Sequence, residues 1–237
     1  MHRYKRLIAG LNLSEQDEAI IQYAAMFCRR VKPEAMHFVH IVPRINIPMS
    51  IRLKYPNMFR TVLNQMERIL ERHWEAGKGA AFAYEVVEGT PLTELIYQAA
   101  AHASDLILVG NRREQRKSGA LPERLALEAT CSVLIVPEGV KPKLTKTLVV
   151  TANSNVPARD PAATLQKMAR ERRADLLVID AREPSHAALL ATVIKQTIQT
   201  TAMPLLVWKT GNWDTSARKA AFDWEDDMWE APRSLAA

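Results

Sequence analysis

One short polar segment between two apolar runs carries the residues best suited to binding an anion. It begins at Gly110 and ends at Gly119. Glycines let backbone N–H groups approach phosphate oxygens, and a helix starting after Gly119 would add the positive end of its dipole. Charge could also replace those amides, since arginine forks bind phosphate through paired hydrogen bonds. Four cations lie between the two glycines: Arg112, Arg113, Arg116 and Lys117. The simpler alternative is a solvated basic loop.

The histidines and cysteines do not form a recognisable catalytic or metal-binding pattern. His37 and His40 lie on one predicted strand at odd spacing, so they face opposite sides and cannot share a metal. His73, His102 and His186 are isolated on predicted helices. The sequence has no zinc-like Cys/His spacing, nucleophile elbow or Walker loop. We therefore expect no catalytic residue, no metal site and no enzymatic activity.

The apolar runs on either side of the basic segment predict two neighbouring parallel strands. Leu106 to Val109 and Val133 to Val136 are nearly unbroken, as is typical of strands covered on both faces. We expect Leu7 to Leu11 on the other side of the first. Ligands of open α/β sheets bind beyond the carboxyl ends of the strands, where the basic segment lies. Further predicted elements are strands at Met36 to Val42 and Ala83 to Val87, an irregular connection over 44–56, and intervening helices. The order predicts an α/β fold with a doubly wound, mainly parallel five-stranded sheet.

The α/β pattern restarts in reduced form after a linker near residue 141. Ala103-Ser-Asp-Leu-Ile-Leu-Val is echoed by Arg173-Ala-Asp-Leu-Leu-Val-Ile, and Thr130-Cys-Ser-Val-Leu-Ile-Val by Ala202-Met-Pro-Leu-Leu-Val-Trp. Two echoes in the same order favour a degenerate tandem repeat whose second copy lacks one helix and one strand. We expect the copies to pack through Val133 to Val136 and Leu205 to Trp208, because a reduced repeat cannot bury its own core. The predicted division is a domain over 1–140, a reduced repeat over 141–210 and a tail over 211–237.

The tail differs from the rest of the chain in charge and composition. It holds three basic and six acidic residues, whereas the remainder holds 29 basic and 20 acidic. Large apolar side chains are costly to leave exposed, so we expect an apolar set in the tail to bind a partner protein or pack on the basic body. The set comprises Phe222, Trp224, Met228 and Trp229. The alternative is a disordered tail with incidental aromatics. The basic body lacks the interleaved aromatics that bind single-stranded nucleic acid, so we expect no nucleic-acid partner.

Several segments resemble the universal stress protein family. Tyr4 to Ser14 resembles its opening strand, and Val86-Val-Glu-Gly-Thr-Pro91 its strand-to-helix turn. Ala103 to Gly110 and Gly119 to Val136 resemble its closing half. The resemblance covers about 1–138 well and 145–209 weakly. It implies a Rossmann-like sheet of five strands, dimers formed through the last strand, and sensing or regulation rather than catalysis.

The resemblance also identifies a phosphate loop with four departures. Nucleotide-binding members carry Gly-x2-Gly-x9-Gly-Ser/Thr after the fourth strand. Gly110 matches the first glycine, but Arg113 replaces the second. Only residues 114–118 separate Arg113 from Gly119, where the family pattern has a spacer of nine residues. Ala120 replaces the hydroxyl residue, and Asn12 takes the position of the usual aspartate after the first strand. The site implied by the resemblance is therefore altered or lost. The corresponding segment of the second half, residues 180–185, contains no glycine.

Together these observations predict a cytoplasmic, non-enzymatic regulatory protein that binds another protein through its tail, without a cofactor. Cys28 and Cys131 indicate reduced thiols, no signal peptide is evident, and no apolar run is long enough to cross a membrane. A homodimer is compatible with the same pattern. The alternative is an adenine-nucleotide sensor whose altered loop still closes on ATP or AMP. Its site would comprise Asn12, Gly110, Arg112, Arg113, Arg116, Gly119 and Ala120.

Overall fold

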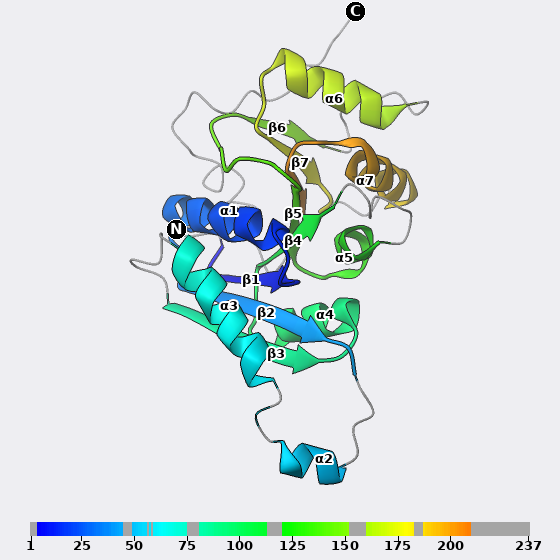
Figure 1. Ribbon diagram of the computed structural model, residues 1–237. Helices are drawn as coiled ribbons and strands as arrows, with labels where there is room; N and C mark the ends of the chain where they lie inside the picture. The colour runs from blue at the N-terminus through cyan, green and yellow to red at the C-terminus, as the bar shows by residue number, and fades with distance from the viewer. Residues whose placement is uncertain are drawn as a thin grey trace, which may run out of the picture.

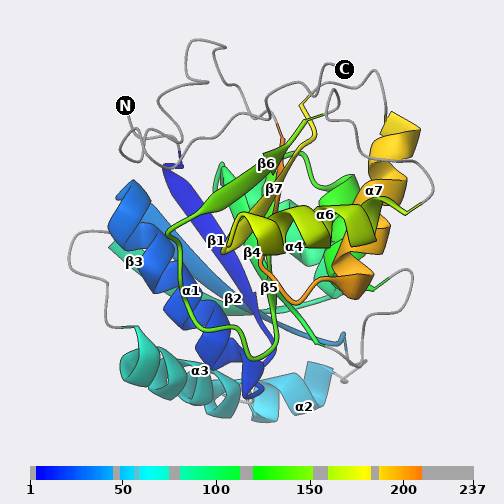
Figure 2. The same ribbon diagram turned by 90° about the horizontal axis from the view of Figure 1, so that it is seen from above.

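The computed structural model describes residues 4–44, 49–55, 57, 59–74, 81–112, 120–151, 160–182 and 187–209. These residues form one eight-stranded sheet with helices on both faces (Figures 1 and 2). The strand order is β3-β2-β1-β4-β5-β8-β7-β6. No helix among the described residues is both long enough and apolar enough to span a bilayer.

The first half contributes five parallel strands, as predicted. They are β1 (Arg6–Leu11), β2 (Ala35–Val42), β3 (Ala81–Glu88), β4 (Leu106–Asn111) and β5 (Ser132–Pro137). Strand β4 lies between β1 and β5 and is parallel to both, in the registers Leu7 with Leu106 and Ile107 with Val133. The expected neighbours of the two apolar runs are therefore confirmed.

The helices of the first half cover the two faces of the sheet in pairs. They are α1 (Gln16–Val31), α2 (Met49–Lys54), α3 (Arg60–His73), α4 (Pro91–Ala101) and α5 (Leu121–Glu128). Buried residues such as Phe27 of α1 and Met66 of α3 pack on one face, and Leu95 of α4 and Leu125 of α5 pack on the other. Helix α2 lies within the segment expected to be an irregular connection, so that expectation is wrong for its residues. Figure 1 shows α2 projecting from the body.

The second half repeats the geometry of the first where its sequence echoes it. Its elements are β6 (Thr147–Val150), α6 (Pro161–Glu171), β7 (Leu176–Asp180), α7 (Ala187–Thr200) and β8 (Leu205–Trp208). Asp105 accepts hydrogen bonds from two backbone N–H groups at the start of β1, and Asp175 accepts two from the residues just before β6. Ala103 and Arg173, two residues before each aspartate, share a left-handed backbone, with φ of 48° and 53°. The two echoed segments therefore form the same structural motif, in which an aspartate fixes the start of one strand against its neighbour.

The second half reproduces only part of the first half. Strand β6 pairs with β7 as β1 pairs with β4, and β7 pairs with β8 as β4 pairs with β5. Within the described ranges, nothing in the second half corresponds to β2 or β3. The expectation that the second half lacks one strand is therefore wrong, because counterparts of two strands are missing among the residues described there.

The two halves join through β5 and β8, the strands expected to meet. The pairing is antiparallel, with Leu134 opposite Leu206, and both residues are fully buried. Polar contacts surround the pairing: the Asn111 amide donates to the carbonyl of Ile198 at 2.9 Å, and Lys195 Nζ lies 3.5 Å from Glu123 Oε1. The buried clusters on both faces of the sheet contain residues of both halves. The halves therefore share one continuous core.

The hydrogen bonds to Asp175 predict that the protein loses stability at low pH. Burial raises the pKa of this carboxyl, but hydrogen bonds from Thr145, Lys143 and the backbone outweigh burial and leave the pKa below its usual 3.8. The ionised carboxylate therefore stabilises the fold above pH 3.8, and this contribution disappears as the pH falls through the lower folded-state pKa. We expect Asp175→Asn to lower the free energy of unfolding by about 1–3 kcal/mol at pH 7, as for other hydrogen bonds to charged groups.

Urea unfolding at a series of pH values measures this effect. The difference in the free energy of unfolding between wild type and Asp175→Asn should become smaller below pH 3.8, because the wild-type carboxyl then becomes protonated and loses its charge. Glu171→Gln is the matched control, because Glu171 is an exposed acid on the preceding helix, 4.0 Å from Lys167. A pH-independent difference would show that the charge of Asp175 contributes nothing.

The β5–β8 pairing predicts the behaviour of the first half alone. A fragment of residues 1–138 would expose the edge of β5 from Val133 to Ile135, which β8 covers in the full chain. Unpaired, flat apolar edges recruit other strands, so we expect the fragment to self-associate or to unfold at a lower temperature than the full chain. Size-exclusion chromatography with light scattering and thermal unfolding measure both outcomes. A monomeric fragment with the stability of the full chain would contradict the shared-core account.

Candidate functional site

The carboxyl edge of β1 and β4 is the place where this sheet would bind a ligand. From β1 the chain proceeds outward to β2 and β3, whereas β4 is followed by β5 on the other side. The crevice at such a reversal of strand order is the usual ligand site of open α/β sheets. Asn12 follows β1, and Gly110 lies near the end of β4. The structure therefore brings these two predicted residues to the same edge.

The turn after β1 already uses the backbone groups that could hold a phosphate. The buried carboxylate of Asp17 accepts hydrogen bonds from the N–H groups of Asn12, at 3.1 Å, and Leu13, at 2.6 Å. Burial raises the pKa of Asp17, while these hydrogen bonds and the charge of His40 act in the opposite direction. The side chain of Asn12 accepts from the backbone N–H of Ser14 at 3.1 Å and so closes the turn on itself.

Asp17 does not form a capping box with Ser14, although the spacing of the two residues is that of a capping box. Helix α1 begins at Gln16, its N-cap residue is Glu15, and Glu15 makes no side-chain cap. The carboxylate of Asp17 reaches farther back, to Asn12 and Leu13, because Leu13 adopts a left-handed backbone with φ of 57°. Both N–H groups are therefore used by Asp17.

Gln16 fills the crevice at the end of β4. Its side chain is nearly buried, with 7% of the residue exposed, and its Nε2 lies 3.5 Å from the carbonyl oxygen of Val136 on β5. A Cβ added to Gly110 would lie 2.6 Å from the amide group of Gln16. The absence of a side chain at Gly110 therefore makes room for Gln16. Gln16 was not among the residues predicted from the sequence, because its contact with Gly110 joins residues more than 90 positions apart.

The remaining predicted anion-binding residues are only partly described. Arg112 is partly exposed directly after Asn111, which is buried and bonded to α7. Ala120 precedes α5 in an extended conformation and provides no side-chain cap. Arg113, Arg116 and Gly119 lie outside the described residues. Of the predicted anion-binding residues, the structure therefore describes Asn12, Gly110, Arg112 and Ala120.

The corresponding edge of the second half is filled by an ion pair. Arg182 donates from Nε to Asp180 Oδ1 at 2.7 Å and from its terminal nitrogen to Oδ2 at 2.5 Å. The guanidinium lies 3.4 Å from the centre of the Trp208 ring, a cation–π distance. Only 13% of the Arg182 side chain and 11% of the Asp180 side chain are exposed. Arg182 therefore neutralises Asp180 and occupies the place that a second ligand would need.

A separate cavity lies beyond the ends of β2 and β3. Its volume is about 500 Å³. It adjoins the beginning of α4, where Thr90 is the N-cap residue and Pro91 follows it. Arg44 and Glu94 give the wall opposite charges. The lining residues are Ile41, Pro43, Arg44, Gly89, Thr90, Pro91, Thr93 and Glu94.

Comparison with known proteins agrees with this architecture. A model of the universal stress protein family matches residues 3–137, more than half of the chain. A universal stress protein from Archaeoglobus fulgidus is 14% identical over 87% of this chain and 97% of its own, with a TM-score of 0.55. A putative universal stress protein from Pseudomonas aeruginosa is 13% identical over 88% of this chain and 94% of its own, with a TM-score of 0.56. No curated protein sequence matches significantly. At these identities the solved structures show the fold, and the family match shows that this chain belongs to the universal stress protein family.

Proposed function

We propose that this chain is a non-catalytic regulatory member of the family that acts by binding another protein. The observation that carries the proposal is the position of Gln16, whose side chain fills the crevice between the ends of β1, β4 and β5. Asp17 uses two backbone amides of the same crevice. Because the chain's own side chains occupy the usual ligand position, function is better supported at the surface than at this edge.

The acidic, aromatic tail is the proposed partner-binding element. Its apolar residues are Phe222, Trp224, Met228 and Trp229, and they lie outside the described residues. Aromatic anchors surrounded by charge are typical of protein interfaces. The edge of β5, through which the family resemblance implies dimers, is paired with β8 in this chain. A homodimer would therefore need a different surface.

An adenine-nucleotide sensor is the second candidate function, and the cavity beside α4 favours it. The cavity is large enough for part of a nucleotide, and Arg44 in its wall could contact a phosphate. The carboxylate of Glu94 lies against Gly89 in the same wall, in the space that a side chain at Gly89 would need. That negative charge opposes phosphate binding, so we rank the sensor below the protein-binding function.

Calorimetry with Mg-ATP separates the two candidates. We expect no saturable binding at low-micromolar concentration in the wild type, because Gln16 and Asp17 occupy the crevice. Gln16→Ala opens space beside Gly110, so any ATP affinity should appear first in this variant. Gln22→Ala is the matched control, because Gln22 lies on the same helix and bonds only the exposed Glu18 among the contacts described. A low-micromolar dissociation constant in the wild type would favour the sensor, and Arg44→Ala would then test the cavity.

The tail predicts the behaviour of individual tryptophans. We expect Trp224 and Trp229 to be buried against a basic surface of this chain or of its partner. Replacing either with Ala should weaken that docking by about 2 kcal/mol or more, as for buried aromatic anchors. Trp213→Ala is the matched control, because Trp213 precedes the acidic aromatic segment. Salt should weaken the docking only in part, because apolar burial is not screened.

Difference fluorescence between wild type and each tryptophan variant measures this burial, with acrylamide as the quencher. Blue-shifted and protected emission from Trp224 and Trp229 is the expected result, either in the purified protein or after addition of cell extract. Water-exposed emission from both residues under both conditions would mean that the tail is solvated, and the protein-binding function would lose its main element.

A further inference from the structure

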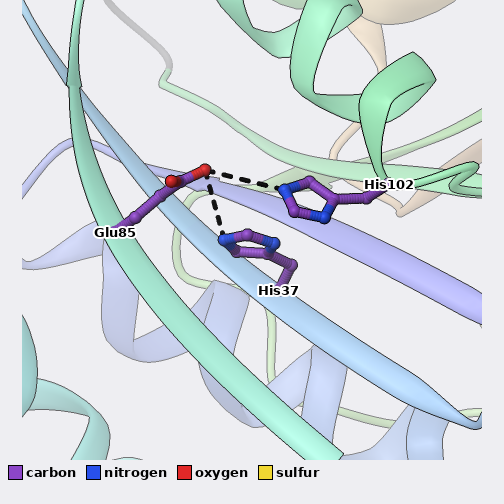
Figure 3. Close-up of side chains that lie close together, drawn as sticks. All are labelled: His37, Glu85 and His102. Atoms are coloured by element: carbon purple, nitrogen blue, oxygen red, sulfur yellow. Dashed lines mark ion pairs between the residues drawn. The ribbon is translucent and has the colours of Figure 1, made fainter.

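Two histidines and one glutamate meet on the outer part of the sheet, away from the carboxyl-edge crevice. His37 lies on β2 and Glu85 on the adjacent β3, two positions beyond the residue that pairs with His37. His102 is the C-cap residue of α4, which packs over this face through Leu95 and Ala99. The fold thus brings together three residues that are 17 to 65 positions apart in the sequence. Figure 3 shows both rings directed at the carboxylate.

The atoms that could bind a metal converge on one point. His37 Nε2 lies 3.3 Å from Glu85 Oε1, and His102 Nε2 lies 3.8 Å from the same oxygen. One ligand atom from each residue lies within 4.8 Å of the other two. Two nitrogen or oxygen ligands of a tetrahedral zinc ion lie about 3.3 Å apart, given bond lengths of about 2.0–2.1 Å. Small rotations of the side chains would bring all three into that geometry.

The cluster is incompletely satisfied by its own contacts. His37 Nε2 and Glu85 Oε1 are inaccessible to solvent, and neither makes a hydrogen bond within the described part of the chain. The two imidazole rings lie 4.1 Å apart, centre to centre, so two protonated rings would repel each other. Burial lowers the pKa of His37, the charge of His102 lowers it further, and Glu85 acts in the opposite direction.

The sequence reading treated His102 as isolated and excluded a metal shared by His37 and His40. His40 does lie elsewhere, with its Nδ1 3.0 Å from the carbonyl oxygen of Leu11. The expectation that His102 is isolated is wrong, because the fold places it beside His37 of β2 and Glu85 of β3. No spacing rule for zinc motifs covers such an arrangement.

We propose that His37, Glu85 and His102 form a binding site for a divalent transition-metal ion, with zinc as the natural occupant. Two imidazoles and one carboxylate are a common ligand set for zinc, with a fourth position left for water. His102 is on the exposed side, with 42% of its side chain accessible, so the ion can enter there. The ion would join the end of α4 to β2 and β3. This site is independent of the proposed protein-binding function.

Calorimetry with zinc chloride on the full, untagged and chelator-treated chain tests the proposal. We expect one zinc ion per chain, and thermal unfolding at a higher temperature when zinc is present. His102→Gln and Glu85→Gln should each weaken zinc binding at least tenfold, since even the loss of a residue that only supports a ligand costs about 10–100-fold. Cobalt(II) in place of zinc should give the visible absorption of a low-symmetry site in the wild type only.

His73→Gln is the matched control for these variants. His73 is also a histidine near the end of a helix, and it contacts one carboxylate, that of Glu18 at 3.6 Å. Its replacement should leave zinc affinity unchanged. His102 and Glu85 are partly exposed, so their variants should fold, and circular dichroism checks this. Absence of zinc binding in the wild type overturns the proposal, as does equal binding in the wild type and both site variants.

Discussion

The antiparallel pairing of β5 with β8 is the interaction on which the rest of the structure depends. Each partner is a parallel strand within its own half, and both are fully buried where they meet. A three-stranded second half has too little surface to bury a core alone. By extending the sheet of the first half, it gains a continuous core on both faces. Around the pairing, Asn111 at the end of β4 bonds α7, and Glu123 of α5 pairs with Lys195 of α7.

This arrangement has consequences for what the protein can do. The pairing with β8 covers the edge of β5. In this chain, that edge is therefore used within one molecule, whereas the family resemblance implies its use between two molecules of a dimer. The two carboxyl edges are filled in chemically different ways: Gln16 lies against Gly110, and Arg182 pairs with Asp180 over Trp208. At both edges, polar side chains of the chain itself occupy the space. They are the basis of our proposal that this chain acts through its surface and tail rather than through a nucleotide site.

The sequence predicted the parts of the fold that depend on apolar pattern and failed where distant side chains meet. The buried runs at Leu106 and Val133 identified the central strands, and the two echoes identified the repeat and its pairing. The contact between Gln16 and Gly110 spans more than 90 residues, so no local pattern reports it. His37, Glu85 and His102 come together only because of strand register and the packing of α4. Helix α2 was missed because prolines on both sides suggested an irregular segment.

Hydrogen exchange of the native full chain tests the central claim most directly. If β5 and β8 hold the two halves in one core, the amides of Val133 to Ile135 and Leu205 to Val207 should be among the slowest to exchange. They should also open together, because their exchange would require the same cooperative unfolding. Exchange in β8 that is orders of magnitude faster than in β5, under conditions where the first half stays folded, would contradict the account.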